Sequence, residues 1–267
     1  MHWPAEDLWL AISPKLPGFS VEVLPTLDST NTELMRRARA GQTDPVLLVA
    51  EQQTAGRGRL GRQWQSQAGD SLTFSLGLTL SPADWSGLSL AIGGAIVQAL
   101  DPAGDLGLGL KWPNDVWVMP PPASQDRPRK LAGILVETAS PALRTSMEAS
   151  ARYCVIGVGI NLRAPPASDN PIAPIGLREL DPTATPPEVL RRLAPPLVQT
   201  VLDFEQRGFA PFQSSFNARD VLRGRAVTLS DGQQGMGRGV NDKGEFLLAQ
   251  GDALVRIHSA EVSVRPL

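Results

Sequence analysis

The stretch TAGRGRLGRQW, from Thr54 to Trp64, constrains the fold more than any other feature of the sequence. Its three glycines match the G-x-G-x-x-G pattern of dinucleotide-binding folds, which needs a strand before it, a helix after it and an acidic residue about 20 residues further on. PVLLVAEQQ supplies the strand, but RQWQSQAGDS has no helical period and no acid lies between residues 71 and 82. The sequence therefore argues against that fold, and the absence of Gly-Lys-Ser/Thr argues against a Walker loop.

The same loop carries Arg57, Arg59 and Arg62 among its glycines. Glycine lets backbone N–H groups approach an anion closely, and arginine adds forked donors that suit phosphate and carboxylate. The alternative is a solvated basic turn. Because the loop lies between two strand-like runs and not in a low-complexity tail, we favour an anion site. Self-repulsion and sparse apolar anchoring also predict that the loop is mobile until an anionic ligand orders it.

Hydrophobic periodicity predicts both helices and strands along the chain. Strand-like runs are expected at 19–24, 45–53, 71–80, 108–119, 130–138 and 153–162, and helices at 28–42, 88–100 and 188–208. Thr30 and Glu33 are expected to form a capping box, and Gly41 stands where a C-terminal glycine belongs. Pro195 and Pro196 are expected to divide the last helix, because proline inside a helix loses a hydrogen bond and clashes. The proline-rich segments 119–129 and 163–187 are expected to be irregular.

The sequence pattern changes after residue 220, where short strand-like runs alternate with the turns SDGQQ, NDKG and QGD. We therefore expect two domains, 1–219 and 220–267. A hydrophobic share of 42% fits a packed core, and a net charge of −2 argues against a broad surface for duplex DNA. The single cysteine, Cys154, excludes an internal disulfide and a cysteine-based zinc site. No signal peptide and no membrane-length apolar run is present, so we expect a cytoplasmic protein.

Further polar patches have two interpretations each. In KWPND, Asn114 and Asp115 suit an ordinary turn, but Lys111 could also approach a phosphate while Asp115 holds magnesium. In DSTN, residues 28–31 suit a helix cap or present donors to a small ligand. In RKLAGILVE, Lys130 precedes a strand in which Gly133 marks either a bulge or a close approach. In VIGVGINL, the apolar strand closes with the amide side chain of Asn161, which either begins a loop or recognises the edge of a base.

Taken in order, the patches STN, GRGRLGRQW, KWPND, KLAG and GVGIN resemble the motifs of the biotin–protein ligases. The likeness runs from about residue 20 to the end of the sequence. It implies an α+β fold: a mixed-sheet catalytic domain of the class II aminoacyl-tRNA synthetase and biotin ligase type, with a small C-terminal SH3-like β-barrel. Only about 20 residues precede the first expected strand, so we expect the form that lacks an N-terminal DNA-binding domain.

The resemblance implies a two-step reaction. Biotin and ATP first form biotinyl-5'-AMP and pyrophosphate, with Mg²⁺ present, and a lysine of a biotin carboxyl carrier domain then takes the biotinyl group and releases AMP. The expected partners include neither DNA nor a membrane. Members of the family can also pair as homodimers through sheet edges, but no feature of this sequence decides the oligomeric state.

The resemblance also assigns roles by position. The residues implied in catalysis are Lys130, Arg57, Lys111 and Asp115, with Asp115 as the magnesium ligand. The residues implied in biotin binding are Ser29, Thr30, Asn31, Gln53, Gly56, Arg57, Lys130 and Gly133. The residues implied in nucleotide binding are Arg59, Arg62, Trp64, Lys111, Asn114 and Asn161, of which Trp64 would cover the adenine and Asn161 would hydrogen-bond it. Leu60 departs from the pattern, since some members carry another arginine there.

Two other functions are compatible with parts of this pattern. A lipoyl or octanoyl transferase shares the catalytic fold but not the glycine–arginine loop. A non-catalytic sensor that regulates genes would need a DNA-binding part and would not need the full set of charged residues. The sequence therefore favours the ligase.

Overall fold

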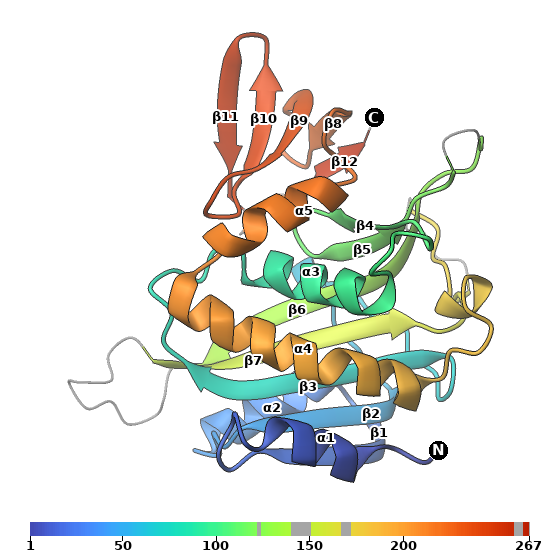
Figure 1. The fold of residues 1–267 in the computed structure, drawn as a ribbon, viewed down its shortest axis with the longest axis vertical. Coiled ribbons are helices and arrows are strands. Elements are labelled where there is room, and N and C mark those ends of the chain that lie inside the picture. Colours follow the sequence, from blue (N-terminus) through green and yellow to red (C-terminus); the bar gives the residue numbers. More distant parts are fainter. Residues whose placement is uncertain (122–123, 140–150, 167–171, 259–263, 267) are drawn as a thin grey trace.

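A computed structural model describes residues 1–121, 124–139, 151–166, 172–258 and 264–266. The described chain forms a large mixed sheet with helices on both faces, and a smaller antiparallel sheet near the C-terminus (Figure 1). Within these segments, none of the helices is both long enough and apolar enough to cross a membrane.

The large sheet is built from the strands β1 (Ser20–Leu27), β2 (Val46–Gln53), β3 (Ser71–Leu80), β4 (Leu108–Lys111), β5 (Asp115–Val118), β6 (Arg129–Ala139) and β7 (Arg152–Asn161). Their order across the sheet is β1-β2-β3-β7-β6-β5-β4. β1 and β2 pair in parallel, and all other neighbours are antiparallel. β3 and β7 are buried along nearly their whole length, which explains their continuous apolar runs.

The helices are α1 (Ala5–Ile12), α2 (Thr30–Arg39), α3 (Leu88–Leu100), α4 (Pro186–Arg207) and α5 (Gln213–Arg219), with short 3₁₀ turns at Arg59–Gly61, Leu177–Glu179 and Ala210–Phe212. Helices α1, α3 and α4 lie over one face of the large sheet, and α2 lies on the other (Figure 1). The expected bounds of α3 are confirmed. The strand after the glycine–arginine loop is β3 and not a helix, which confirms that the loop does not begin a dinucleotide-binding unit.

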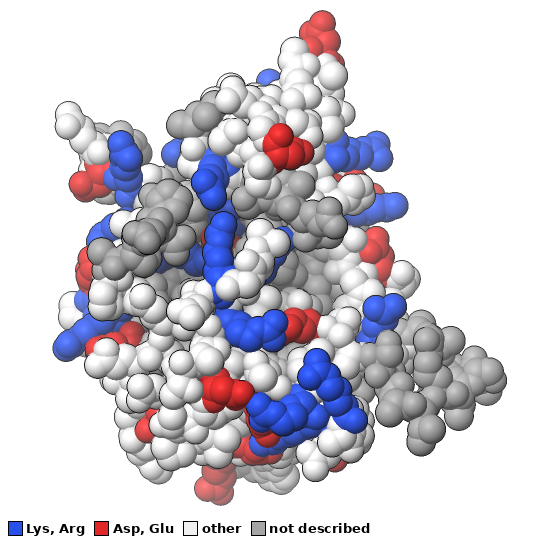
Figure 2. Space-filling model, turned by 180° about the vertical axis from the view of Figure 1, so that it is seen from behind, with Lys and Arg blue, Asp and Glu red and all other residues white. Residues whose placement is uncertain are grey.

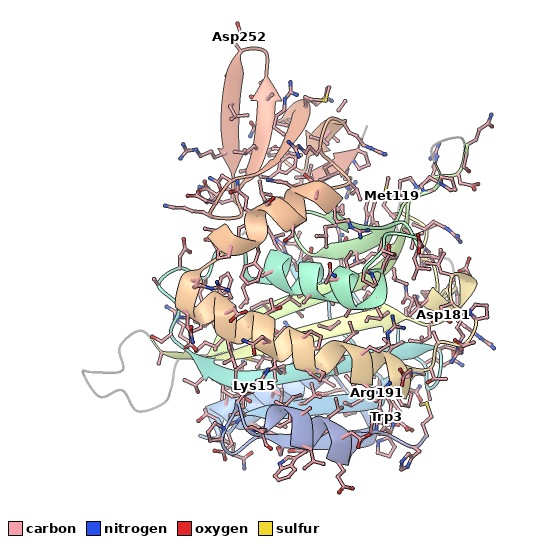
Figure 3. All side chains as sticks on the ribbon, viewed as in Figure 1. Trp3, Lys15, Met119, Asp181, Arg191 and Asp252 are labelled. Carbon is pink, nitrogen blue, oxygen red and sulfur yellow. The ribbon has the colours of Figure 1, made fainter. Side chains whose placement is uncertain are left out.

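The sequence did not predict α1. This helix buries only Leu8 and Ile12, which are four residues apart, so its pattern is too short to stand out. Polar contacts of the residues that flank it hold it in place: Trp3 Nε1 donates a hydrogen bond to Glu51 Oε1 at 2.8 Å, and Lys15 Nζ donates to Gln199 Oε1 of α4 at 2.7 Å. Figure 3 labels Trp3 and Lys15 on either side of α1.

The expected capping box of α2 is wrong by one position. The N-cap is Ser29, whose backbone is extended and whose hydroxyl accepts a hydrogen bond from the N–H of Thr32 at 3.4 Å. Thr30 lies inside the helix, where its hydroxyl meets other buried polar groups. Glu33 does not close a box and pairs instead with Arg36 and Arg37.

The C-terminal end of α2 is as expected. Gly41 has φ of +83°, the left-handed conformation that favours glycine. Its N–H donates to the carbonyl of Ala38, and the N–H of Gln42 donates to the carbonyl of Arg37, both at 3.0 Å. This pair of hydrogen bonds is the Schellman arrangement, which satisfies the last carbonyls of the helix.

The expected break at Pro195 and Pro196 is also wrong, because α4 is continuous through both prolines. Pro195 is half-buried and Pro196 is exposed, so they lie away from the buried side of the helix. That side packs Leu193, Leu197 and Val201 into the core. Burial of this apolar face outweighs the hydrogen bonds that the prolines remove.

The small sheet contains β8 (Ala226–Leu229), β9 (Gln234–Val240), β10 (Phe246–Gln250), β11 (Ala253–Ile257) and β12 (Val264–Pro266), in the order β11-β10-β9-β8-β12. It contacts the turn after β4 through Trp112, which is fully buried. Trp112 Nε1 donates to the carbonyl of Gly244 at 3.1 Å, and its ring lies 5.5 Å from that of Phe246. An all-β unit after residue 220 agrees with the sequence, and the domain boundary itself stays a prediction.

Candidate functional site

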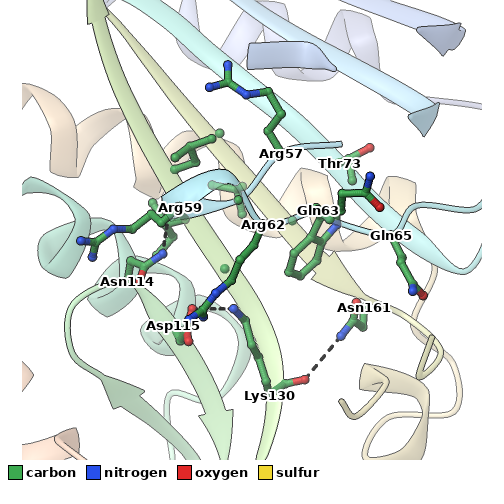
Figure 4. A pocket seen from close by; sticks show the side chains of 18 of the residues that line it. Arg57, Arg59, Arg62, Gln63, Gln65, Thr73, Asn114, Asp115, Lys130 and Asn161 are labelled. Carbon is green, nitrogen blue, oxygen red and sulfur yellow. Dashed lines mark hydrogen bonds and ion pairs between the residues drawn. The ribbon is translucent and has the colours of Figure 1, made fainter. Parts of the chain in front are cut away.

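A pocket of about 570 Å³ opens on the side of the large sheet that carries α2. It is formed by the start of α2, the end of β2, the glycine–arginine loop, the turn between β4 and β5, and strands β3, β6 and β7 (Figure 4). The sequence-predicted residues that line it are Ser29, Thr30, Asn31, Gln53, Arg57, Arg59, Arg62, Trp64, Lys111, Asn114, Asp115, Lys130, Gly133 and Asn161. The structure thus brings together segments that are far apart in the sequence.

Strand register explains why these segments converge. Thr73 of β3 pairs with Gly159 of β7, which pairs with Gly133 of β6, which in turn pairs with Asp115 of β5. These residues form one row across the sheet, and all of them line the pocket. The glycines keep the middle of the row open.

The indole of Trp64 occupies the space above these strand glycines. A Cβ atom at Gly159 would clash with the indole ring, so this position needs glycine for Trp64 to lie there, whereas a Cβ atom at Gly133 would only touch the ring tightly. Lys130 Nζ lies 5.7 Å from the centre of a ring of this indole, within reach of a cation–π contact. The buried Nε1 of Trp64 has no hydrogen-bond partner among the residues that the structure describes.

Gly56 does not line the pocket, in contrast to its predicted neighbours in the loop. The N–H of Trp64 donates a hydrogen bond to the carbonyl of Gly56 at 2.9 Å, which closes the base of the loop. A Cβ atom at Gly56 would meet the backbone of Trp64, so glycine permits this closure. Its predicted contact with biotin stays a prediction.

One end of the pocket is neutral and polar, with Ser29, Thr30, Asn31 and Gln53 all buried. The N–H of Thr30 donates to Gln53 Oε1 at 2.7 Å, so the amide NH₂ of Gln53 is turned elsewhere as a donor. Ser75, which is fully buried on β3, fixes two neighbours: its Oγ lies 2.7 Å from both Thr30 Oγ1 and Asn31 Oδ1. Ser75 was not predicted as part of the site, although a serine inside the apolar run of β3 was a usable signal.

Glu137 of β6 was also missed. Its carboxylate accepts a hydrogen bond from Asn31 Nδ2 at 2.9 Å and forms an ion pair with Arg57 at 3.1 Å. The only sequence signal is an acid at the end of an apolar strand.

The other end of the pocket is charged. Lys130 Nζ lies 2.7 Å from Asp115 Oδ1, and Figure 4 shows the two side chains facing one another. Lys111 is buried, and this burial lowers its pKa to about 8, against the opposing effect of Asp115. Burial also lowers the pKa of Arg59. Charged side chains with this much desolvation interact strongly with a ligand of opposite charge.

Two amides beside this cluster are oriented by backbone carbonyls. Asn114 Nδ2 donates to the carbonyl of Ile134 at 2.8 Å, and Asn161 Nδ2 donates to the carbonyl of Lys130 at 3.4 Å (Figure 4). Asn161 is the last residue of β7, so it both ends the strand and faces the pocket.

The charge balance around the pocket is strongly positive. Among the described lining residues, Asp115 is the one acid, and the cations are Arg57, Arg59, Arg62, Lys111, Lys130 and Arg265. Figure 2, which views this side of the molecule, shows Lys and Arg side chains along the middle of the face. Arg265 comes from β12, and nothing in the sequence pointed to it, because only the packing of the small sheet brings it here. The arrangement suits a ligand with several negative charges.

Comparisons with known proteins agree with this geometry. The profile of the "Biotin/lipoate A/B protein ligase family" matches residues 23–161. The bifunctional ligase/repressor BirA of Escherichia coli is 36% identical over 94% of this chain and 76% of its own length. The biotin–[acetyl-CoA-carboxylase] ligase of Mycobacterium tuberculosis is 32% identical over 91% of this chain and 88% of its own length.

A solved structure shares the fold. The biotin protein ligase of Aquifex aeolicus, in complex with biotin and ATP, has a TM-score of 0.72 and 25% sequence identity, and the match covers 92% of this chain and 99% of that chain. The α+β architecture with a small C-terminal β unit, expected from the sequence motifs, is thereby confirmed.

Proposed function

Because this chain belongs to the biotin/lipoate A/B protein ligase family, we propose that it activates biotin with ATP and transfers biotin to a lysine of a biotin carboxyl carrier domain. One observation carries the proposal: a single pocket joins a neutral end of buried hydroxyl and amide groups to an end rich in cations. A ligand with a polar uncharged head and a reacting carboxylate fits the first end, and a polyphosphate fits the second.

The first step joins two anions. An oxygen of the biotin carboxylate attacks the α-phosphorus of ATP, a new O–P bond forms, and the bond to the β-phosphate oxygen breaks to release pyrophosphate. Since both reactants are negative, the site must neutralise and align them. Lys130 and Lys111 supply that positive charge from the predicted catalytic positions, and Arg57, also predicted there, adds its charge from the loop, where it is paired with Glu137.

The second step breaks the mixed anhydride. The amine of the acceptor lysine attacks the acyl carbon, an amide bond forms, and AMP leaves with its phosphate oxygens still held by the cations. The amine loses a proton in the process. Arg59 and Arg62 of the loop retain the adenylate, and Trp64 and Asn161 bind its base, so that water is kept from the anhydride.

Biotin recognition is assigned to the neutral end. Ser29, Thr30, Asn31 and Gln53 offer hydroxyl and amide groups whose orientation is fixed by their own hydrogen bonds. Such preorganised groups bind a ureido ring with little loss of side-chain entropy. Gly56 and Gly133 are proposed to let the ligand approach the backbone.

The donor set fits magnesium only in part. Mg²⁺ is usually held by one or two carboxylates together with phosphate oxygens and water. Asp115 is the one acidic side chain among the described lining residues, and those residues contain no cluster of three or more potential metal-ligating acids, histidines or cysteines. Asp115 would therefore hold Mg²⁺ together with the oxygens of ATP. When bound, the ion supplies charge that offsets the phosphates.

The partner is a biotin carboxyl carrier domain, in line with the carboxylase ligase names of the relatives. Homodimer formation and a cytoplasmic location stay predictions, and so does the absence of a DNA partner. The molecular mass of the protein in solution, measured with and without biotin and ATP, tests whether it forms a homodimer.

One assay tests the function directly. The protein is incubated with ATP, Mg²⁺, biotin and a carrier domain, and the mass of the carrier is measured. We expect a gain that corresponds to one biotinyl group. If biotin is inert and lipoate or octanoate is transferred instead, the acyl transferase of the same fold is correct; if none is transferred while biotin still binds, the sensor is correct.

A further inference from the structure

Glu137 lies near the end of β6 and contacts two separate parts of the pocket. Its Oε2 accepts a hydrogen bond from Asn31 Nδ2 at 2.9 Å. Its Oε1 lies 3.1 Å from a guanidinium nitrogen of Arg57, and a second nitrogen of Arg57 donates to Oε2 over 3.5 Å. One carboxylate thus joins the start of α2 to the start of the glycine–arginine loop.

The position of Glu137 follows from strand geometry. Side chains two residues apart share a face of a strand, so Gly133, Leu135 and Glu137 project on the same side of β6. Gly133 and Leu135 line the pocket, which places Glu137 on the pocket side at its edge. Its neighbour Asn31 is locked, because Ser75 lies 2.7 Å from Asn31 Oδ1 and leaves Nδ2 directed at Glu137 and at the carbonyl of Leu135. The Glu137 carboxylate is therefore held in place by Asn31 independently of its ion pair with Arg57.

Arg57 differs from the other arginines of its loop. Figure 4 shows that its side chain points away from the Lys130–Asp115 pair, whereas Arg62 extends toward it. The Arg57 side chain is 50% exposed and that of Glu137 only 22% exposed, so the anchored partner is the glutamate. Without this pair the first arginine would be free to move, and the repulsion among three clustered arginines would favour an open loop.

We propose that Glu137 is a positioning residue for biotin: its charge ties Arg57 to β6 and so fixes the loop backbone over the neutral end of the pocket. The inference rests on the proposed biotin site and extends it, since it explains how the entrance of that site is shaped before the nucleotide binds. Arg57 then acts on biotin through the placement of the loop as well as through its charge.

The kinetic test uses Glu137→Gln. The amide oxygen still accepts from Asn31, but the charge that holds Arg57 is lost. We expect the KM for biotin to rise about two- to fivefold, the range for a partly exposed ion pair, while kcat stays nearly unchanged. Arg57→Gln is expected to raise KM at least as much, and the double variant should be no worse than Arg57→Gln alone, because both changes remove the same interaction.

A matched control is available on the other side of the sheet. Glu188→Gln breaks the exposed ion pair with Arg191, 2.8 Å long, on α4 (Figure 3 labels Arg191). This variant should keep the wild-type KM for biotin. Thermal unfolding of all variants, which we expect to stay near the wild-type temperature, checks that they are folded.

A second readout does not depend on enzyme activity. Trypsin cuts after Arg59 and Arg62, and the cutting rate in the protein without ligands reports how often the loop opens. Glu137→Gln should be cut about two- to fivefold faster, and Glu188→Gln at the wild-type rate. Unchanged cutting together with an unchanged KM, or losses that add fully in the double variant, would overturn the proposal. If the wild-type protein does not ligate biotin, the proposed function fails, but the proteolysis still decides whether Glu137 holds the loop.

Discussion

Lys111 is the one charged side chain around the pocket, among those that the structure describes, that is almost completely buried. Its surroundings hold the carboxylate of Asp115, which raises its pKa, and the cations Lys130, Arg59 and Arg62, which lower it. Burial and like charges disfavour the ammonium form, which is why its pKa falls to about 8. A lysine in this state is charged at neutral pH but titrates just above it, so the charge that we assign to nucleotide binding depends on pH.

This dependence gives the first prediction. As the pH rises through about 8, Lys111 loses its proton and the site loses a positive charge, so the KM for ATP should rise. Lys111→Arg stays charged at these pH values and should remove the rise, even if its KM is higher at pH 7. Initial rates from pH 6.5 to 9.5 test this, with Lys243→Arg as the exposed control. A pH profile in the Lys111→Arg variant that matches wild type would refute the assignment.

The second prediction separates two roles within the cation-rich end. Lys130→Ala should lower adenylate formation by about 10²-fold or more, because it removes the cation paired with Asp115. Arg59→Gly should still form the adenylate but release it into solution. Burst assays for adenylate and a filter assay for its retention measure both. Equal retention in Arg59→Gly and wild type would count against the loop as a barrier.

Among the elements, α4 carries the clearest conflict between local sequence and packing. Two prolines interrupt its hydrogen bonds, yet its buried face keeps it continuous. Pro196 is exposed, so it contributes little packing in return. Pro196→Ala restores an N–H group to the helix and should raise the free energy of unfolding by about 1–2 kcal/mol. Urea denaturation measures the change; a decrease would mean that the proline is needed for the path of the helix.

Local patterns account for the elements that the sequence predicted well. β3, β7 and α3 have long apolar runs with one clear period, and Gly41 ends α2 because a left-handed residue is needed there. The sequence-based predictions were wrong where tertiary contacts, and not local sequence, determined the conformation. Thr30 was placed at a cap by its type, but buried partners on β2 and β3 draw its side chain inward and leave Ser29 to cap.

At the scale of the whole molecule, the site shows the same contrast: residues in local motifs were predicted, and residues positioned by tertiary structure were not. Contiguous motifs located Lys130, Asp115 and the loop arginines, because each motif keeps its residues together in the chain. Arg265, which lines the pocket, and Ser75 and Glu137, which hold the lining residue Asn31, were not found, because their positions depend on strand register or on the packing of a second sheet. A single sequence holds no direct signal for either.

The junction between the two sheets contains a buried carboxylate. Asp220 Oδ1 accepts a hydrogen bond from the N–H of Leu222 at 2.9 Å. Its buried Oδ2 has no partner in the described part of the chain, and burial raises the pKa of the carboxyl group to about 6. The folded protein therefore binds more protons than the unfolded chain between about pH 4 and 6, and the free energy of unfolding falls as the pH rises through this range.

Asp220→Asn removes this titration. Relative to wild type, the variant should gain little stability near pH 4 and at most about 3 kcal/mol at pH 7, the upper limit that the shift in pKa allows. Thermal unfolding at both pH values measures the difference. A gain that is the same at both would show that the charge of Asp220 is not the cause.

The indole of Trp112 is inserted between the two sheets, and its neighbours in the chain are Lys111 and, three residues on, Asp115. A smaller enzyme made by trimming the chain before β8 would consequently lose the support of its own reactive turn. If the part before β8 and the small sheet were expressed as two separate polypeptides, we expect neither to ligate biotin alone. Activity would return when the two parts reassemble, so ligation could report their association in a split reporter.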